Sequence, residues 1–337
     1  MHRFEFLRAA TVADAVAELA REPNAQVVAG GTNLVDLMKY HITTPSKIID
    51  ITRLPLKTIE QRTDGGISIG GLVTNADVAA NSMVQQNYPL LASAILAGAS
   101  GQLRNAATTG GNLLQRTRCS YFYDTHTPCN KRDPGSGCPA ISGRNRPHAI
   151  LGTSERCIAT HPSDMCVALS ALDAAVRVVG PHGERLIAIS DFHRLPGETP
   201  ERDTTLAHDE IVLAVELPTT RYDLHSYLKI RDRQSFAFAL VSVAAAVTVT
   251  DGVISTAAVA VGGVAHKPWR VAEAEAVLVN RPPDASAFSE CAGRMVRGAI
   301  GRPYNAFKIE LAQRAIVRAL TQAINGTPQS QRAKHVC

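Results

Sequence analysis

The sequence predicts an α+β protein, with a large N-terminal part and a smaller α+β part that begins near residue 220. In the N-terminal part, apolar strand patterns run into glycine turns that open short helices. In the C-terminal part, two long apolar runs flank Asp251-Gly252, which is typical of a hairpin. Between Arg116 and Arg156 no period of 2 or 3.6 residues is present. We therefore expect two packed units and one irregular insert.

Capping signals and apolar periodicity define the elements of the N-terminal part. Thr11 and Asp14 form a capping box for an amphipathic helix, and Thr74 forms another with Asp77. Residues 88–106 have the pattern of a helix that ends near Gly98. Extended segments are expected at 26–29, 47–51, 66–70, 174–179 and 210–217, and further helices at 34–39 and 162–172.

The C-terminal part follows Pro218, which ends the preceding strand. The apolar runs 236–249 and 253–261 predict the two strands of the hairpin. Helices at 271–279 and 304–324 are expected to cover that sheet, and the tail after Gly326 is polar.

Composition excludes several classes of protein. The chain has 337 residues, 45% of them hydrophobic, and a formal net charge of +5. It has no stripe of basic residues interleaved with aromatics, so nucleic-acid binding is not expected. Its start lacks a basic segment followed by an apolar one, and its apolar runs fall short of a membrane span, so we expect neither a signal peptide nor membrane insertion.

Two glycine turns have the form of anion-binding nests. Gly30-Gly31-Thr32-Asn33 and Thr109-Gly110-Gly111-Asn112 are each followed by leucine, and glycine lets backbone N–H groups approach a phosphate without a Cβ in the way. Neither turn matches the Rossmann or P-loop pattern. Each could be no more than a tight turn. Two together favour a dinucleotide-like ligand, because a pyrophosphate needs donors from more than one direction.

Four of the seven cysteines lie in the irregular insert, and the first 118 residues contain none. Their spacing lacks the close Cys-x-x-Cys pair of most structural zinc sites, whereas a [4Fe–4S] cluster accepts thiolates from scattered loop positions. We interpret Cys119, Cys129, Cys138 and Cys157 as ligands of such a cluster. A zinc site and a basic loop with incidental cysteines are the alternatives.

Basic side chains surround these cysteines. A [4Fe–4S] cluster with four thiolate ligands has a net charge of about −2, which nearby cations would offset. The window contains seven basic residues against three acidic ones. The basic residues are Arg116, Arg118, Lys131, Arg132, Arg144, Arg146 and Arg156.

Four motifs carry a resemblance to a known family. They are Val27-Val28-Ala29-Gly30-Gly31-Thr32-Asn33-Leu34, the run Leu103 to Asn112, His161-Pro162-Ser163-Asp164 and the run Tyr227 to Arg233. In this order they resemble the flavin subunits of molybdenum hydroxylases, over nearly the whole chain. The cysteine window is an addition to the common pattern, and is similar to aldehyde oxidoreductase flavin subunits that carry an extra [4Fe–4S] cluster.

The resemblance implies a fold and cofactor sites. Residues 1–221 would form a two-part FAD-binding domain of the vanillyl-alcohol-oxidase or PCMH type with the cluster insert at about 115–158, residues 222–326 the CO dehydrogenase flavoprotein C-terminal-type domain, and residues 327–337 a polar tail. Asp164 would lie near the FAD and Lys229 at the flavin ring, unless Asp164 only caps its helix and Lys229 is a surface strand residue. The other expected FAD contacts are Val28, Ala29, Gly30, Gly31, Thr32, Asn33, Leu34, Thr108, Thr109, Gly110, Gly111 and Asn112.

The function that the resemblance implies is electron transfer. A molybdenum-cofactor large subunit would oxidise an aldehyde, a small [2Fe–2S] subunit would relay electrons, and this subunit would deliver them from FAD to an external acceptor. A flavin subunit of a 4-hydroxybenzoyl-CoA-reductase-like complex, a stand-alone FAD oxidase and a zinc-stapled interaction module are the alternatives. Without its own signal, the subunit would be cytoplasmic, or periplasmic by export together with a signal-bearing partner.

Overall fold

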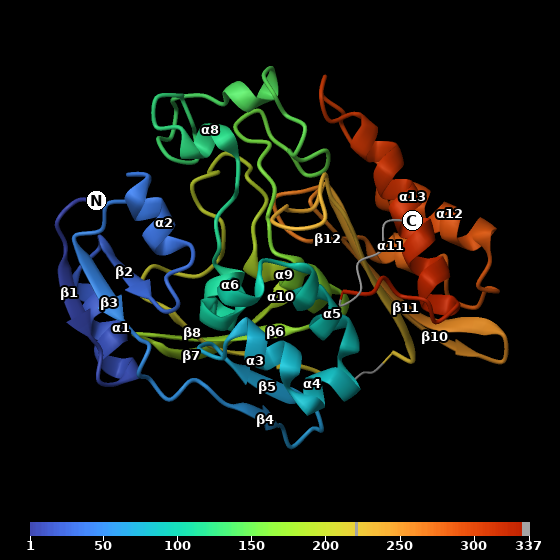
Figure 1. Cartoon of the computed structure of the whole chain (residues 1–337), viewed down its shortest axis with the longest axis horizontal. Coiled ribbons are helices and arrows are strands. Elements are labelled where there is room, and N and C mark those ends of the chain that lie inside the picture. The colour runs from blue at the N-terminus through green and yellow to red at the C-terminus, as the bar shows by residue number, and fades with distance from the viewer. Residues whose placement is uncertain (220–221, 332–337) are drawn as a thin grey trace.

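The structure is a computed structural model that describes residues 1–219 and 222–331, and it contains three sheets with helices packed on them (Figure 1). Sheets and helices are both major components, so the predicted α+β class is confirmed. The expected boundary between the two domains falls on residues 220 and 221, which lie outside the described residues. So do residues 332–337 of the expected tail.

The first sheet is small and parallel. It has the order β1 (Glu5–Arg8), β3 (Lys47–Asp50), β2 (Ala25–Val28), and both pairs are parallel. Helix α1 (Val12–Arg21) connects β1 to β2 and begins with the predicted reciprocal capping box at Thr11. Helix α2 (Leu34–Lys39) follows β2 directly. The first glycine turn therefore lies at the carboxyl end of β2.

The second sheet is antiparallel and has five strands. Its order is β4 (Ile59–Gln61), β5 (Ile67–Gly70), β8 (Ile211–Leu217), β6 (Ala175–Gly180), β7 (Gly183–Ala188). Its apolar face is buried in the largest hydrophobic core. The helices of this part are α3 (Asn75–Ala80), α4 (Ser82–Asn87), α5 (Pro89–Ala97), α6 (Gly101–Ala106), α7 (Thr109–Leu113), α9 (Asp164–Ala171) and α10 (Ile189–Phe192).

The C-terminal part has a four-stranded antiparallel sheet of order β12 (Trp269–Arg270), β11 (Val253–Gly262), β10 (Val241–Thr250), β9 (Leu224–Ile230). The predicted hairpin is β10 and β11. Helix α13 (Phe307–Ile324) packs on this sheet and buries an apolar face in a separate core (Figure 1). The shorter helices are α11 (Ala272–Glu275) and α12 (Ala285–Met295).

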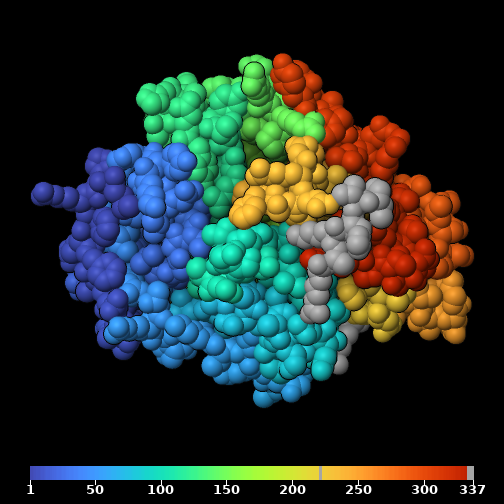
Figure 2. Space-filling model, viewed as in Figure 1, coloured from blue at the N-terminus to red at the C-terminus, as the bar shows by residue number. Residues whose placement is uncertain are grey.

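The cysteine insert is folded, although it contains only helix α8 (Ser120–Tyr123) and a 3-10 turn, Pro139–Ile141. The Arg132 guanidinium donates to the carbonyls of Tyr121 and Phe122, and Phe122 packs against Leu37 of α2. The insert, green in Figure 2, lies at the top of this view, beside the N-terminal residues, which are blue. Hydrogen bonds from side chains to backbone thus provide much of the order that its sequence pattern lacks.

Some elements differ from the expectation. The helix predicted to end near Gly98 is α5, which ends at Ala97 as expected, but a separate helix, α6, follows Ala99, whose backbone has a φ of 51°. The helix predicted at 271–279 is only α11, whereas the longer α12 was not expected. Its start was readable, because the Asp284 side chain caps it by accepting from the Ala287 N–H. Strand β7 was also missed.

Candidate functional site

The two glycine turns line one cavity. Residues 29–34, after β2, and residues 108, 110 and 111 border a space of about 340 Å³. A second space, of about 210 Å³, shares Thr32, Asn33 and Gly111 with the first and extends to Asp164 and Lys229. We call these two spaces together the groove. It runs from the small parallel sheet to the C-terminal domain.

The first glycine turn presents donors to the groove. Within the described residues, the backbone N–H groups of Gly30 to Leu34 have no protein acceptor. A Cβ at Gly30 would lie 1.8 Å from the carbonyl oxygen of Ala106, and Gly31 has a φ of 70°, so neither position accepts another residue without a shift. The turn therefore has the donors and the close approach that a pyrophosphate requires.

The second glycine turn has a different role. The N–H groups of Thr109 and Gly110 donate to the carbonyls of Val73 and Gly71, at 2.9 and 2.8 Å. The Gly111 N–H donates to the Thr108 hydroxyl at 3.2 Å. These amides are therefore engaged within the protein, and the second turn shapes the wall of the groove more than it supplies free donors.

A buried ion pair closes the far end of the groove. The Lys229 ammonium lies 2.7 Å from an Asp164 carboxylate oxygen, and the Tyr227 hydroxyl donates to the other oxygen at 2.7 Å. Ser163, and not Asp164, caps α9, because its hydroxyl accepts from the Cys166 N–H. Lys229 is buried, so it is not a surface strand residue. Both alternative interpretations of these two residues are wrong.

The expected FAD contacts line the groove, with two exceptions. Val28 borders neither cavity, and Thr109 is buried with its hydroxyl donated to the Val73 carbonyl. Whether the rest contact FAD stays a prediction. Sequence reasoning missed several groove residues, one on α6 and the others on loops, whose positions in the groove no local pattern specifies. They are Arg104, Gln115, Arg118, Arg231, Phe236 and Phe238.

The four cysteines of the insert border one small cavity of about 10 Å³. All four are free thiols. Burial raises the pKa of Cys119 to about 12 and that of Cys157 to about 11, and it also raises the pKa of Cys138. Such thiols stay protonated unless a metal displaces the proton. A donor set of four convergent thiols suits a metal or an iron–sulfur cluster.

Two neighbouring groups contact these thiols. The Nε2 atom of His148 lies 3.0 Å from Cys119 Sγ, and the Ala159 N–H points to Cys157 Sγ at 3.4 Å. Hydrogen bonds to cluster sulfurs are a common feature of iron–sulfur sites. The surroundings are therefore compatible with buried thiolates.

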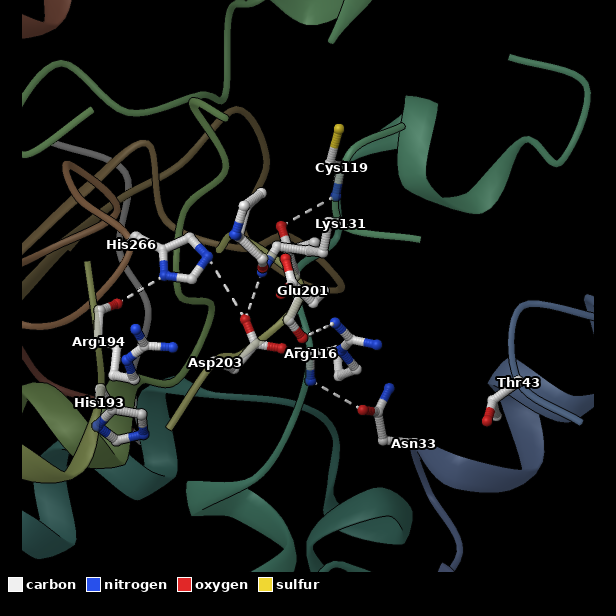
Figure 3. Close-up of polar contacts among 12 residues, drawn as sticks. Asn33, Thr43, Arg116, Cys119, Lys131, His193, Arg194, Glu201, Asp203 and His266 are labelled. Carbon is white, nitrogen blue, oxygen red and sulfur yellow. Dashed lines mark hydrogen bonds and ion pairs between the residues drawn. The ribbon is translucent and has the colours of Figure 1, made fainter. Parts of the chain in front are cut away.

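Of the seven basic residues in the window, only Lys131 is fully buried. Its ammonium lies 2.5 Å from the Asp203 carboxylate, and Arg116 donates to the other carboxylate oxygen at 2.8 Å (Figure 3). Burial alone would raise the pKa of Asp203, but the charges of Lys131 and Arg116 hold it well below its usual range. Among the basic residues of the window, the buried charge near the four cysteines thus comes from Lys131.

The insert is tied to the groove through Arg116. Its backbone N–H donates to the Asn33 side-chain oxygen at 2.9 Å, and its side chain binds Asp203 (Figure 3). His266 of the C-terminal part also faces Asp203, with Nε2 at 3.4 Å. Asp203 therefore joins the cysteine insert to the C-terminal domain, and Arg116 joins both to the first glycine turn.

Comparison with known proteins identifies the family. Residues 2–220 match the model of the FAD-binding domain in molybdopterin dehydrogenases. The chain belongs to this family. Residues 226–323 match the CO dehydrogenase flavoprotein C-terminal domain. This molybdopterin dehydrogenase chain is accordingly an FAD-binding subunit of an oxidoreductase, and the groove, which contains both glycine turns, is its candidate FAD site.

Relatives of known activity cover nearly the whole chain. It is 50% identical to the aldehyde oxidoreductase FAD-binding subunit PaoB of Escherichia coli K12, over 96% of this chain and 99% of that one. It is 26% identical to the glyceraldehyde dehydrogenase medium chain of Sulfolobus acidocaldarius, over 94% and 95%. A carbon monoxide dehydrogenase structure from Hydrogenophaga pseudoflava superimposes with a TM-score of 0.75 at 23% identity, covering 96% of this chain and 98% of that one.

Among the described helices, none is long and apolar enough to cross a membrane.

Proposed function

We propose that this chain is the FAD- and [4Fe–4S]-containing electron-transfer subunit of a heterotrimeric, molybdenum-dependent aldehyde oxidoreductase. A molybdenum-cofactor large subunit would oxidise the aldehyde, and a [2Fe–2S] small subunit would deliver the electrons. Bound FAD supplies the exchange between one-electron centres and a two-electron acceptor. The roles of this chain are to hold the cofactors, to exclude water and to set their potentials.

The convergence of the four cysteines on one cavity carries the proposal for the cluster. These residues are spread over a long insert in the sequence, yet all border the same space. The buried Lys131 nearby offers a positive charge to a cluster of net negative charge. The similarity to PaoB over nearly the whole chain supports the aldehyde oxidoreductase assignment.

Cofactor analysis tests this proposal directly. The complex, purified anaerobically, is expected to contain FAD, and four irons with four acid-labile sulfides at this subunit. Cys129→Ser or Cys157→Ser should lose that iron and sulfide, whereas Cys291→Ala should retain both, because Cys291 is buried in the separate C-terminal core. Zinc at the four cysteines without sulfide would contradict the cluster.

The substrate and the partners need the intact complex. Turnover of aromatic aldehydes is expected, with no turnover of acyl-CoA substrates, which would instead indicate a 4-hydroxybenzoyl-CoA-reductase-like enzyme. Co-purification of two other subunits is expected, and turnover by this chain alone would indicate a stand-alone oxidase.

We further propose that an acidic electron carrier docks on the basic insert. Reduction of such a carrier should then fall steeply as salt concentration rises, because screening weakens surface attraction. Turnover that is insensitive to salt would contradict this docking. Export together with a signal-bearing partner is proposed for the compartment, and fractionation of cells checks it.

A further inference from the structure

A second cluster of metal-ligating side chains lies outside the four-cysteine cavity. The three residues are His161 from the segment between the insert and α9, Cys166 from α9, and His193 directly after α10. Their ligand atoms all lie within 4.8 Å of one another. Among the described residues, no other group of three or more histidine, cysteine, aspartate or glutamate side chains brings its ligand atoms so close together. From these contacts we propose that His161, Cys166 and His193 bind a zinc ion.

The tautomer of His193 is set for metal binding. Its Nε2 atom lies 2.9 Å from the carbonyl oxygen of Leu113, and a carbonyl only accepts, so Nε2 carries the proton. The lone pair is therefore on Nδ1, which is buried and has no protein partner. Metal-binding histidines usually donate their other N–H to a carbonyl or carboxylate in this way.

The ring of His161 also lacks hydrogen-bond partners. Both of its ring nitrogens are buried without a hydrogen-bond partner, although its backbone N–H is fixed on the Ala265 carbonyl at 3.0 Å. A buried polar atom without a partner loses its hydrogen bonds to water and gains none in return. The ring of His161 lies 4.3 Å from that of His193, centroid to centroid. A cation would satisfy nitrogens of both rings at once.

The protonation states fit a metal. Burial keeps the pKa of His161 well below its usual value and lowers that of His193 to about 4, so both rings are neutral ligands at physiological pH. Cys166 is fully buried, and burial raises the pKa of its thiol to about 12. Zinc would displace that proton, as it does at other cysteine sites.

Two imidazoles and one thiolate are ligands that zinc prefers. The fourth position can be a water, because His161 also borders a cavity of about 330 Å³. The ion would join α9, whose first residue is Asp164 of the groove, to the segment after α10. It is separate from the four-cysteine cavity and does not depend on the proposed cluster.

Metal counting on single variants tests the site. We expect one zinc per FAD in the wild-type complex after gel filtration with EDTA, and at least a tenfold loss in Cys166→Ala and in His193→Gln. Cys291→Ala, a substitution of another buried thiol, should retain the zinc. X-ray absorption at the zinc edge should show two nitrogens at about 2.0 Å and one sulfur at about 2.3 Å.

FAD content and melting temperature, measured on the same samples, identify a variant that fails to fold. If Cys166→Ala or His193→Gln fails in this way, the zinc content of the other variant is the test. The proposal is overturned if the wild-type complex holds no zinc after growth with added zinc and incubation with Zn²⁺, which would leave a water between the two rings. It is also overturned if Cys166→Ala and His193→Gln both keep the zinc. Iron and sulfide, counted in parallel, report on the four cysteines separately.

Discussion

The ammonium of Lys131 and the carboxylate of Asp203 form a 2.5 Å ion pair that joins the cysteine insert to the segment before β8. Lys131 lies in the wall of the four-cysteine cavity, and Asp203 also holds Arg116, which contacts the first glycine turn. This ion pair thus connects the proposed cluster to the groove. Its two charges have opposite effects on a negatively charged centre.

Removal of the Lys131 charge and removal of the Asp203 charge should therefore shift the cluster potential in opposite directions. Lys131→Met removes a cation and should disfavour the reduced cluster by about tenfold at a fixed solution potential, which is a fall of about 59 mV for one electron. Asp203→Asn leaves Lys131 unopposed and should raise the potential. Redox titration followed by electron paramagnetic resonance measures both. Arg146→Met makes the same charge change at an exposed pair with Asp232, away from the wall of the four-cysteine cavity, and should have little effect. Shifts of the same sign in both variants would contradict this arrangement.

Gly30→Ala should weaken FAD binding at least tenfold. A Cβ at this position would lie 1.8 Å from the Ala106 carbonyl oxygen, so the first glycine turn must shift from its position in the wall of the groove. Equilibrium dialysis of FAD against the variant checks this expectation. Gly101→Ala is the matched control, because no atom lies within 4 Å of its Cβ position. Equal FAD affinity in the two variants would mean that the turn does not hold the cofactor.

The Asp164–Lys229 pair should behave as a coupled unit in stability. Asp164→Asn or Lys229→Met leaves one buried group without its partner, which is expected to lower the free energy of unfolding by about 3–5 kcal/mol. The double variant should lose less than the sum of the two, because neither charge is then left alone. Urea unfolding with saturating FAD measures the three variants. Arg146→Met, at an exposed pair with Asp232, is the control and should change little. Additive losses would show that the two residues act independently.

Stability should fall between pH 6.5 and about pH 4, in part through His266. Burial, together with the charge of Lys131, lowers the pKa of this histidine to about 4, and its Nδ1 lies 2.7 Å from the Arg194 carbonyl. In the unfolded chain this histidine binds a proton near pH 6.5, whereas in the folded chain it stays neutral down to about pH 4. Its contribution to the free energy of unfolding is therefore complete above pH 6.5 and is lost as the pH falls from 6.5 to about 4. His266→Gln should flatten the slope of the melting temperature against pH there, whereas His182→Gln, at an exposed turn, should leave it unchanged. An unaltered slope in His266→Gln would contradict the assignment.

The sequence by itself determined much of this protein. The capping box at Thr11, the glycine turns and the hairpin around Asp251-Gly252 are local signals, because each depends on backbone geometry within a few residues. The run of motifs indicated the family. The cysteine spacing identified the insert as unusual without a period to describe its fold.

Tertiary structure decided the rest, because it depends on contacts between distant segments. Only the fold places the four cysteines on one cavity, and only the fold selects Lys131 from seven basic residues as the buried charge. The same holds for the second glycine turn, whose amides are engaged by the carbonyls of residues 71 and 73. The grouping of His161, Cys166 and His193 likewise has no sequence period, since three separate elements bring these side chains together.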